Sequence, residues 1–440
     1  MMSCEHSTLV TPRQITAVTL GNALEFYDFL TYSFFAIQIG HCFFPSESGY
    51  GSLMASLATF GAGFATRPLG ALAIGHYADK VGRKPAMLLS FVLIGLSIFA
   101  MALIPPYQSI GLAAPVFFVA ARMLQGFSLG GEIGSSTAFL VESASPARRG
   151  VIVSFQGASQ MAAVLAGSVV GVALSTALSA DALTAYGWRI AFALGGLVVP
   201  LGWSLRRRLP ETLQVQSSVP ERAGTRADLA RGHWRLMTLG FVILGMGSIA
   251  SYVQMYIVTF AQHGLGLSAH AGFLASSANA VVAIPALLLG GWLSDRYGRW
   301  PVNVLANALL LVLVVPLFAW TVSRGSADVL IVSMSVLGFV SNLPFGAVCA
   351  ALGEGLPQTI RSSGFGTVYS LAMAACGGST EFVVTWLIHL TGSAMAPAWY
   401  VAGATAVAQV ALMLLPESAP IRTKRSQVTL NSSAVAAEHS

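Results

Sequence analysis

The chain contains 440 residues, of which 55% are hydrophobic and only 9% are charged, and its mean hydropathy is +0.72. Soluble domains carry roughly 25% charged residues, so this composition excludes a water-soluble globular protein and predicts a chain solvated by lipid. The net charge of +6 is spread over many loops, which excludes a nucleic-acid-binding patch. The four cysteines lack the spacing of a metal site or a disulfide framework, so no metal and no cofactor are expected.

Apolar segments long enough to cross a hydrocarbon core occur twelve times along the chain, since each crossing needs about 20 helical residues. The segments are continuous rather than alternating, which favours helices over the strands of a barrel. The predicted spans are residues 15–40, 52–76, 86–104, 110–141, 151–177, 189–205, 236–262, 272–293, 301–322, 328–352, 363–390 and 398–415.

The longest polar stretch, 206–235, divides these spans into two sets of six. Of the 23 Lys and Arg residues, 19 fall on one side of the predicted membrane, and the positive-inside rule places that side, with both termini, in the cytoplasm. The predicted organisation is a cytoplasmic N-terminus (1–14), an N-terminal six-helix bundle (15–205), a cytoplasmic linker (206–235), a C-terminal six-helix bundle (236–415) and a cytoplasmic tail (416–440).

Two loop motifs occur once in each half. Gly-x3-Asp-x2-Gly-Arg follows the second and the eighth predicted spans at an offset of 216 residues, and a Glu/Arg pair follows the fourth and the tenth at an offset of 212. Such repetition indicates an internally duplicated carrier. The charged members are predicted to form a cytoplasmic gate of ion pairs that break as the halves rock: Asp79, Arg83, Glu142, Arg149, Asp295, Arg299, Glu354 and Arg361.

The first of these motifs resembles the signature loop of the major facilitator superfamily. Gly21-Asn22 with Glu25 and Asp28, Arg67-Pro68-Leu69-Gly70, Arg122 to Glu132 and Gly187-Trp188-Arg189 are similar to elements of its metabolite:proton symporter family. The second half is most similar to the citrate and tricarballylate symporters, through Arg361-Ser362-Ser363-Gly364-Phe365 and Leu390-Thr391-Gly392 before Pro397-Ala398-Trp399. Residues 251–260 depart from the Thr-rich run of those carriers.

The resemblance implies an all-α membrane protein with twelve transmembrane helices in two pseudo-symmetric halves, the major facilitator fold. It also implies transport by alternating access and no enzymatic activity. No nucleophile–base pair, metal cluster or phosphate-binding loop is visible in the sequence either.

Ionisable residues inside the spans need a reason, because each costs about 2.5–3.5 kcal/mol to insert. Depth along the helices places Asp28 and Arg122 at one level near the midplane. Related proton-coupled carriers set an acid of helix 1 against an arginine of helix 4, so the resemblance makes Asp28 the proton acceptor and Arg122 its counter-ion. A static buried pair is the alternative. The other ionisable residues in the spans are Glu25, Arg67, Glu132 and Glu381.

Glu25 and Glu132 are further candidates for proton coupling. Arg67 is expected to pair with one of these acids. Glu381 is expected to face the cavity rim or to pair locally, with contact to the substrate as the alternative. The candidate substrate-binding residues are Arg122, Asn22, Gln156, Gln160, Tyr256 and Asn279. Apart from Arg122, each has the alternative of an ordinary hydrogen bond between helices.

The sequence therefore predicts a proton-coupled symporter that takes up a small organic acid, a di- or tricarboxylate such as citrate. A symporter of a compatible solute such as betaine or proline is the alternative, and a membrane receptor is a less favoured one. The expected partners are the organic anion, protons and the lipid bilayer, without nucleic acid, and the expected functional unit is a monomer. The expected location is the bacterial inner membrane.

Overall fold

The computed structural model describes residues 12–81, 83–130, 133–207 and 232–419, and these residues are almost entirely helical. We call the described residues up to 207 the first half and those from 232 the second half. The helices of the first half are α1 (Pro12–Phe34), α2 (Ala36–Phe43), α3 (Gly49–Ala65), α4 (Arg67–Val81), α5 (Arg83–Leu103), α6 (Tyr107–Ile110), α7 (Ala113–Leu129), α8 (Ile133–Ser143), α9 (Arg149–Ala177), α10 (Ala180–Ala182), the π-helical turn η1 (Leu183–Gly187) and α11 (Trp188–Arg207).

The second half repeats this pattern of long and interrupted helices. Its helices are α13 (Trp234–Met255), α14 (Ile257–Thr259), the π-helical turn η2 (Phe260–Gly264), α15 (Ala269–Tyr297), α16 (Arg299–Arg324), α17 (Ala327–Asn342), α18 (Phe345–Gly355), α19 (Gln358–Ala372), the π-helical turn η3 (Met373–Gly377), α20 (Gly378–Thr391) and α21 (Ala396–Met413). Every one of the twelve predicted spans overlaps one helix or a series of consecutive helices.

Several helix boundaries follow from capping residues in the sequence. Ser48 and Ser268 begin α3 and α15, where each hydroxyl accepts a hydrogen bond from a backbone N–H three residues later. Gly325 and Gly392 end α16 and α20 in the left-handed conformation, with φ of 57° and 64°, which glycine adopts without strain.

Eight helical stretches within the described residues are long and apolar enough to cross a bilayer, and two shorter apolar helices accompany them. Large apolar side chains such as Leu72, Leu103 and Leu305 are exposed on the outer helices, as expected for a surface that contacts lipid tails. Together with the solved structures reported below, this arrangement confirms the predicted fold class.

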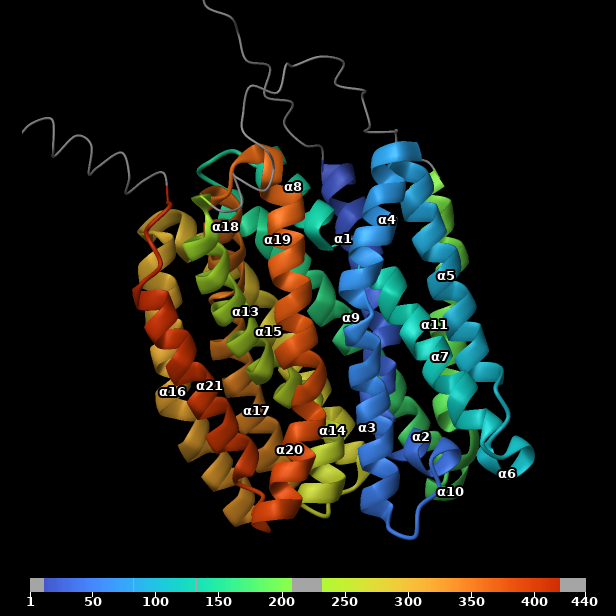
Figure 1. The fold of residues 1–440 in the computed structure, drawn as a ribbon. Helices are drawn as coiled ribbons and strands as arrows, with labels where there is room; N and C mark the ends of the chain where they lie inside the picture. Colours follow the sequence, from blue (N-terminus) through green and yellow to red (C-terminus); the bar gives the residue numbers. More distant parts are fainter. Residues whose placement is uncertain (1–11, 82, 131–132, 208–231, 420–440) are drawn as a thin grey trace, which may run out of the picture.

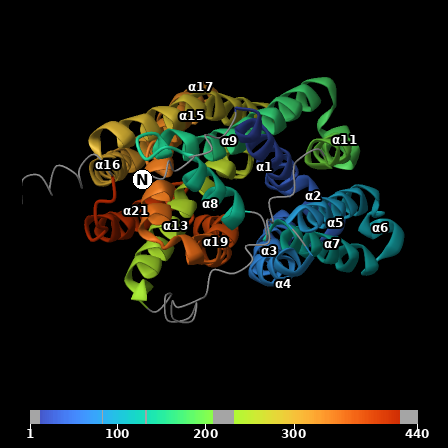
Figure 2. The same cartoon turned by 90° about the horizontal axis from the view of Figure 1, so that it is seen from above.

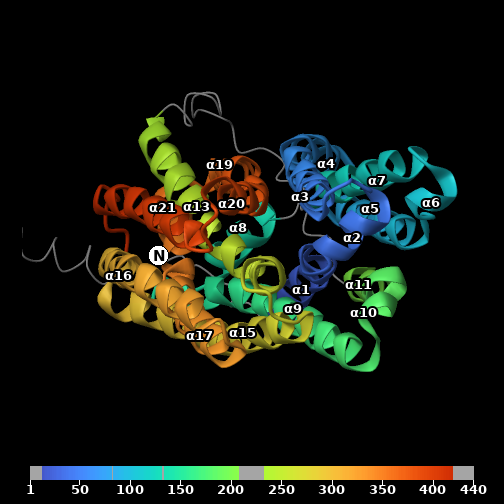
Figure 3. The ribbon, with the colours of Figure 1, turned by 90° about the horizontal axis from the view of Figure 1, so that it is seen from below.

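The two halves lie side by side along a long interface. In Figure 1, both described ends of the chain lie at the top, which we call the terminal end; the bottom, with α6 and α10, is the far end. Seen from either end, α16 and α21 lie on one side and α5 and α7 on the other, with α8 and α9 between them (Figures 2 and 3). α9 of the first half packs along α15 of the second, α3 packs on α20, and α8 packs on α19. These three helix pairs position the site.

Candidate functional site

Arg122 lies in α7 and is completely buried. Its guanidinium carbon lies 4.3 Å from the ring centre of Phe29, 4.6 Å from that of Tyr32 and 4.9 Å from that of Phe60, and its Nη1 donates a hydrogen bond to Gln125. Stacking on aromatic faces is a preference of arginine that lysine shares less well. The structure therefore holds the predicted midplane cation against an aromatic wall built by α1 and α3.

A second arginine shares this wall. The guanidinium carbon of Arg67, at the start of α4, lies 4.5 Å from the ring centre of Phe29 and 4.2 Å from that of Phe64. Phe29 thus contacts both of these arginines. Sequence reasoning missed these rings, although Phe29 with Tyr32, and Phe60 with Phe64, stand at helical spacings that put each pair on one helix face.

The acids predicted to pair with these arginines have side chains that lie outside the described part of the structure. This applies to Asp28, Glu25 and Glu132, so their pairing and their part in proton coupling stay predictions.

Two of the polar candidates in the first half join three helices. Asn22 in α1 donates hydrogen bonds through Nδ2 to the backbone oxygen of Gln156 at 3.1 Å and to Oγ of Ser159 at 2.8 Å. Thr137 in α8 donates to Oε1 of Gln156 at 2.8 Å. Gln160 lies four residues further along α9 and is also buried. Asn22 and Gln156 are therefore interhelical contacts, whatever else they bind.

The candidates in the second half lie in comparable contacts. Asn279 in α15 donates to Oε1 of Gln254 at 3.3 Å, and Gln254 donates to Ser341 in α17 at 2.7 Å. Tyr256, between α13 and α14, accepts a hydrogen bond from Thr385 in α20 at 2.8 Å. Gln254 was not among the predicted residues; its position between two buried polar residues of neighbouring helices became visible only in the fold.

Glu381 differs from its prediction. It is completely buried rather than at a rim, and its contact is not local. Its Oε1 accepts a hydrogen bond from the hydroxyl of Ser33 in α1, so the contact joins the two halves. The reason is that α20 packs its first turns on α3, where Gly61 and Gly378 approach each other closely.

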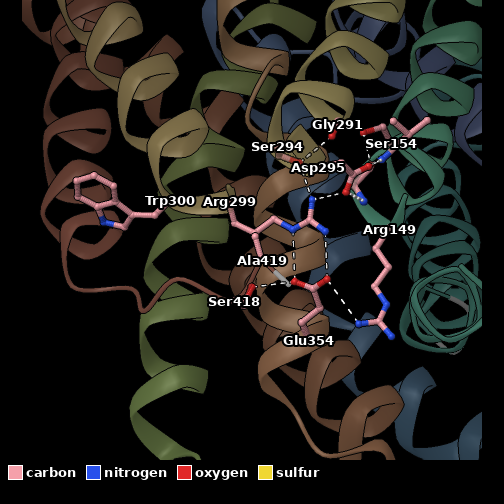
Figure 4. Close-up of polar contacts among 12 residues, drawn as sticks. Arg149, Ser154, Gly291, Ser294, Asp295, Arg299, Trp300, Glu354, Ser418 and Ala419 are labelled. Carbon is pink, nitrogen blue, oxygen red and sulfur yellow. Dashed lines mark hydrogen bonds and ion pairs between the residues drawn. The ribbon is translucent and has the colours of Figure 1, made fainter. Parts of the chain in front are cut away.

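Ion pairs and helix caps join the halves at the terminal end (Figure 4). Asp295, at the end of α15, accepts hydrogen bonds from the backbone N–H groups of Gly150 and Val151 at 2.8 and 2.9 Å. A carboxylate at this position compensates the unpaired N–H groups and the positive end of the α9 dipole. Arg299 donates to the same carboxylate at 2.6 Å. Asp295 therefore ties a helix of the first half to two elements of the second.

The structure explains why glycine occupies two positions of this motif. A Cβ atom on Gly291 would lie 2.2 Å from Oγ of Ser154 and 2.6 Å from the backbone oxygen of Gly150, so only glycine permits α9 and α15 to approach this closely. Gly298 has a φ of 110°, which side chains rarely adopt.

The repeated Glu/Arg pairs contact each other across the halves. Arg149 of the first half lies 3.7 Å from Glu354 of the second, and Arg361 of the second lies 3.2 Å from Glu142 of the first. Glu354 also accepts from Arg299 at 3.1 and 3.3 Å. We call these contacts and those of Asp295 the terminal seam. The side chains of Asp79 and Arg83 lie outside the described residues, so their place in it stays a prediction.

Sequence reasoning missed the contribution of the segment after α21. Ser418 donates to Glu354 at 2.8 Å, and Glu417 accepts from the backbone N–H groups of Arg299 and Trp300 at the start of α16. This segment was assigned to the tail, where no motif marked it.

The contacts between the halves at the far end are made by aromatic rings, hydroxyl groups and two histidines. Phe273 of α15 packs against Phe34 and Phe35, with ring centres 6.0 and 5.4 Å apart. Tyr50 stacks on His389 at 3.9 Å. Ser277 donates to Ser168 at 2.9 Å, and His270 contacts Ser175 at 3.3 Å. We call these contacts the far seam; both seams are formed in this structure.

Comparisons with known proteins agree with this architecture. Residues 18–380 match the model of the Major Facilitator Superfamily. The chain is 36% identical to a citrate-proton symporter of Salmonella typhi, over 88% of this chain and 89% of that one, and 30% identical to a proline/betaine transporter of Salmonella typhimurium, over 88% and 80%. The solved proton:xylose symporter XylE superposes with a TM-score of 0.75 at 18% identity, over 92% of this chain and 96% of that one, which supports the fold alone.

The extent of these matches, together with the duplicated loop motifs, settles the family and the class of protein. The chain belongs to the Major Facilitator Superfamily and, within it, to the metabolite:proton symporters; it is a multi-pass membrane transporter and not an enzyme.

Proposed function

We propose that this transporter takes up a small organic acid, a di- or tricarboxylate such as citrate, together with protons by alternating access. The observation that carries the proposal is Arg122, a guanidinium completely buried among the helices and held against three rings. A buried cation inside a membrane protein is costly and marks a functional site. The similarity to a citrate-proton symporter supports the class of anion.

In this proposal Arg122 binds a substrate carboxylate, for which the planar guanidinium is suited. Asp28 accepts the coupled proton, with Glu25 and Glu132 as further candidates. An anion is repelled while these acids are ionised and is accepted once a proton neutralises one of them. The transporter therefore has to bind a proton in order to bind the anion, and the two are carried together.

The polar side chains near the interface between the halves complete the proposed site. Asn22, Gln156, Gln160, Tyr256 and Asn279 provide donors and acceptors for carboxyl and hydroxyl groups when the halves separate. The terminal seam, with Asp79 and Arg83 added, and the far seam then act as the two gates.

We place the terminal end on the cytoplasmic side of a bacterial inner membrane, together with both termini. The reason is that the predicted loops on this side carry most of the Lys and Arg residues. The expected functional unit is a monomer in the lipid bilayer, since each gate is built within one chain.

A compatible solute such as betaine or proline is the second candidate, because a proline/betaine transporter is 30% identical. Aromatic cages bind quaternary ammonium groups, and this chain has such rings. Here, however, the chain's own arginines cover the faces of Phe29, Tyr32, Phe60 and Phe64. This favours an anion over a quaternary ammonium group.

The test is uptake of labelled citrate by the purified protein in liposomes, with betaine and proline as competitors. We expect an inward proton gradient to drive accumulation, and di- and tricarboxylates to compete. Better competition by betaine or proline would contradict the proposal.

Two variants locate the site within this assay. Arg122→Ala should abolish both accumulation and the exchange of internal for external substrate. Asp28→Asn, a permanently neutral side chain, should abolish accumulation but retain exchange. Arg189→Ala, which removes a far-end arginine stacked on Trp188, is the matched control and should retain both activities.

A further inference from the structure

A buried acid of the second half lies where the two halves meet and has no role in the function proposed above. Glu381 stands in the first turn of α20, directly after the π-helical turn η3, and is 0% exposed. One carboxyl oxygen accepts a hydrogen bond from Ser33 of the other half. The other oxygen, Oε2, is buried and has no hydrogen-bond partner among the described residues.

The titratable and charged groups around Glu381 come from every element packed near it. α1 contributes Tyr32, next to Ser33, and α7 contributes Arg122, whose guanidinium carbon lies 4.6 Å from the Tyr32 ring centre. The others are Tyr252 and Tyr256 from the α13–α14 helix, Cys376 from η3, Tyr400 from α21, and Tyr50 from α3, which stacks on His389 two turns along α20. Within the described part of the chain, Glu381 forms no ion pair with any cation.

A carboxylate in such a place is unfavourable, because the buried charge loses its hydration and gains one hydrogen bond but no ion pair among the described residues. The neutral acid loses much less, and its hydroxyl proton can sit on the oxygen that has no partner. The closed interface around Ser33 and Glu381 is therefore compatible with the protonated acid and strained by the ionised one.

The depth of Glu381 indicates when it can exchange protons. Arg122 and Glu381 lie nine and ten residues from the far-end boundaries of α7 and α20, and Ser33 lies ten residues before the end of α2, the helix that follows α1. Ten residues correspond to about 15 Å at a rise of 1.5 Å per residue. Ser33 and Glu381 belong to opposite halves, so separation of the halves at the far end breaks their hydrogen bond and exposes the carboxyl group to water on that side.

We propose that Glu381 is a second proton-binding site of the transporter, which must take up a proton from the far side before the halves close there over the substrate. This inference rests on the proposed function for the identity of the substrate. One proton from water adds to the carboxylate, giving a neutral acid that accepts the closed interface. The same proton leaves to water when the terminal seam opens and the site is hydrated from that side.

The substrate makes this requirement stricter. A carboxylate bound at Arg122 places a second negative charge near Glu381, and like charges at short range disfavour the ionised form of both. The loaded carrier therefore closes with Glu381 protonated, which adds one proton to each transported anion.

The experiment compares Glu381→Gln with the wild-type protein in liposomes, with citrate as the substrate. The number of protons carried per citrate is obtained from the membrane voltage and pH gradient at which net flux is zero. We expect this number to fall by one in Glu381→Gln, because the variant lacks the carboxyl group that carries this proton. Exchange of internal for external citrate should be retained within about twofold. Glu381→Asp, which keeps an acid, should keep the wild-type number, as should the control Asp328→Asn at an exposed far-end position.

A second readout needs no substrate. Spin labels on Glu47→Cys and Thr391→Cys, in a background without the native cysteines, report the distance between the halves at the far end. In the labelled protein that keeps Glu381, acidification should shift the population of molecules toward the short distance. The shift should be up to about tenfold per pH unit for one linked proton. Glu381→Gln should remove this shift. Ser33→Ala should weaken closure at every pH but keep the shift, which separates a titrating role from a packing role.

An unchanged proton number together with an unchanged acid-driven closure in Glu381→Gln would overturn the inference. Absence of citrate transport by the wild-type protein would overturn the proposed function instead, and the distance measurement would still decide the role of Glu381.

Discussion

The two seams that hold the halves together are built from different chemistry. At the terminal end, Asp295 and Arg299 have side chains only 8% and 1% exposed, and they combine an ion pair with the cap of α9. At the far end, Phe273 packs against Phe34 and Phe35, and stacked rings and hydroxyl groups provide the remaining contacts. The terminal seam therefore depends on charge and geometry, and the far seam on apolar contact.

This difference implies that different conditions weaken the two seams. Charge-assisted hydrogen bonds are directional and lose their energy once a partner moves away, so the terminal seam should open abruptly. Ring packing is less directional and is insensitive to salt. Four variants or conditions test this contrast, beginning with the one of largest expected effect.

Asp295→Asn should disrupt the terminal seam most. The amide keeps one acceptor oxygen where the carboxylate uses two, and it leaves Arg299 without its charged partner on that side. Breaking one side of a buried pair costs about 3–5 kcal/mol, which corresponds to a shift of more than about a hundredfold toward the state open at the terminal end. The population with the short distance between spin labels on Glu47→Cys and Thr391→Cys should rise, whereas Asp328→Asn should leave it unchanged.

Phe273→Ala should have the opposite consequence, because it removes the ring that fills the far seam. Large-to-small substitutions of buried Phe cost about 3–5 kcal/mol, and part of that cost falls on the closed state here. We expect the population with the long distance between labels on Glu47→Cys and Thr391→Cys to rise by at least about tenfold. This increase should not depend on the salt concentration. Phe318→Ala, buried within the second half, is the control, and equal opening in both variants would show that general destabilisation is responsible.

Reversal of the Arg361–Glu142 pair tests the exposed edge of the terminal seam. These side chains are 15% and 34% exposed, and pairs of this kind contribute about 0.2–1 kcal/mol. Arg361→Glu or Glu142→Arg alone should therefore reduce transport by a few-fold at most, and the double variant should recover most of it. The difference should shrink when the salt concentration rises from about 0.1 M to about 1 M. A double variant no better than the single ones would show that the contacts of Arg361 with Gly353 and Leu356 matter more.

Two physical features of the sequence permitted prediction of the fold and of the ion pairs in the terminal seam. Lipid demands long apolar helices, and the duplicated acids and arginines mark their loops with a fixed offset. The reciprocal pairing of Arg149 with Glu354 and of Arg361 with Glu142 is what a two-fold repeat produces when its halves meet face to face. The roles assigned to Asp28, Glu25 and Glu132 stay predictions.

The aromatic wall and the far seam could not be predicted in the same way. Phe29, Phe60 and Phe273 are apolar residues in apolar helices, and nothing in the local sequence distinguishes a ring that contacts an arginine from one that contacts lipid. The burial of Glu381 likewise depends on which face α20 presents to α1, and this is decided by close packing at Gly61 and Gly378.

The last prediction concerns the pH dependence of the far seam and has the smallest expected effect. His263 lies in η2, just beyond the predicted span 236–262. Partial burial, and then the neighbouring imidazole of His41 of the other half, lower the pKa of His263 below its usual value.

The closed far seam therefore binds fewer protons at His263 than the open one, in which both histidines are hydrated. Its contribution to closure is present above the ordinary histidine pKa and is lost as the pH falls through the lowered value. Acid thus opens the seam through His263, opposite in sign to the closure expected from Glu381. In the Glu381→Gln background, the distance between labels on Glu47→Cys and Thr391→Cys should lengthen slightly from about pH 8 to about pH 5. His263→Gln should abolish this change, and His233→Gln, at the terminal end, should not. A change that survives His263→Gln would show that another group is responsible.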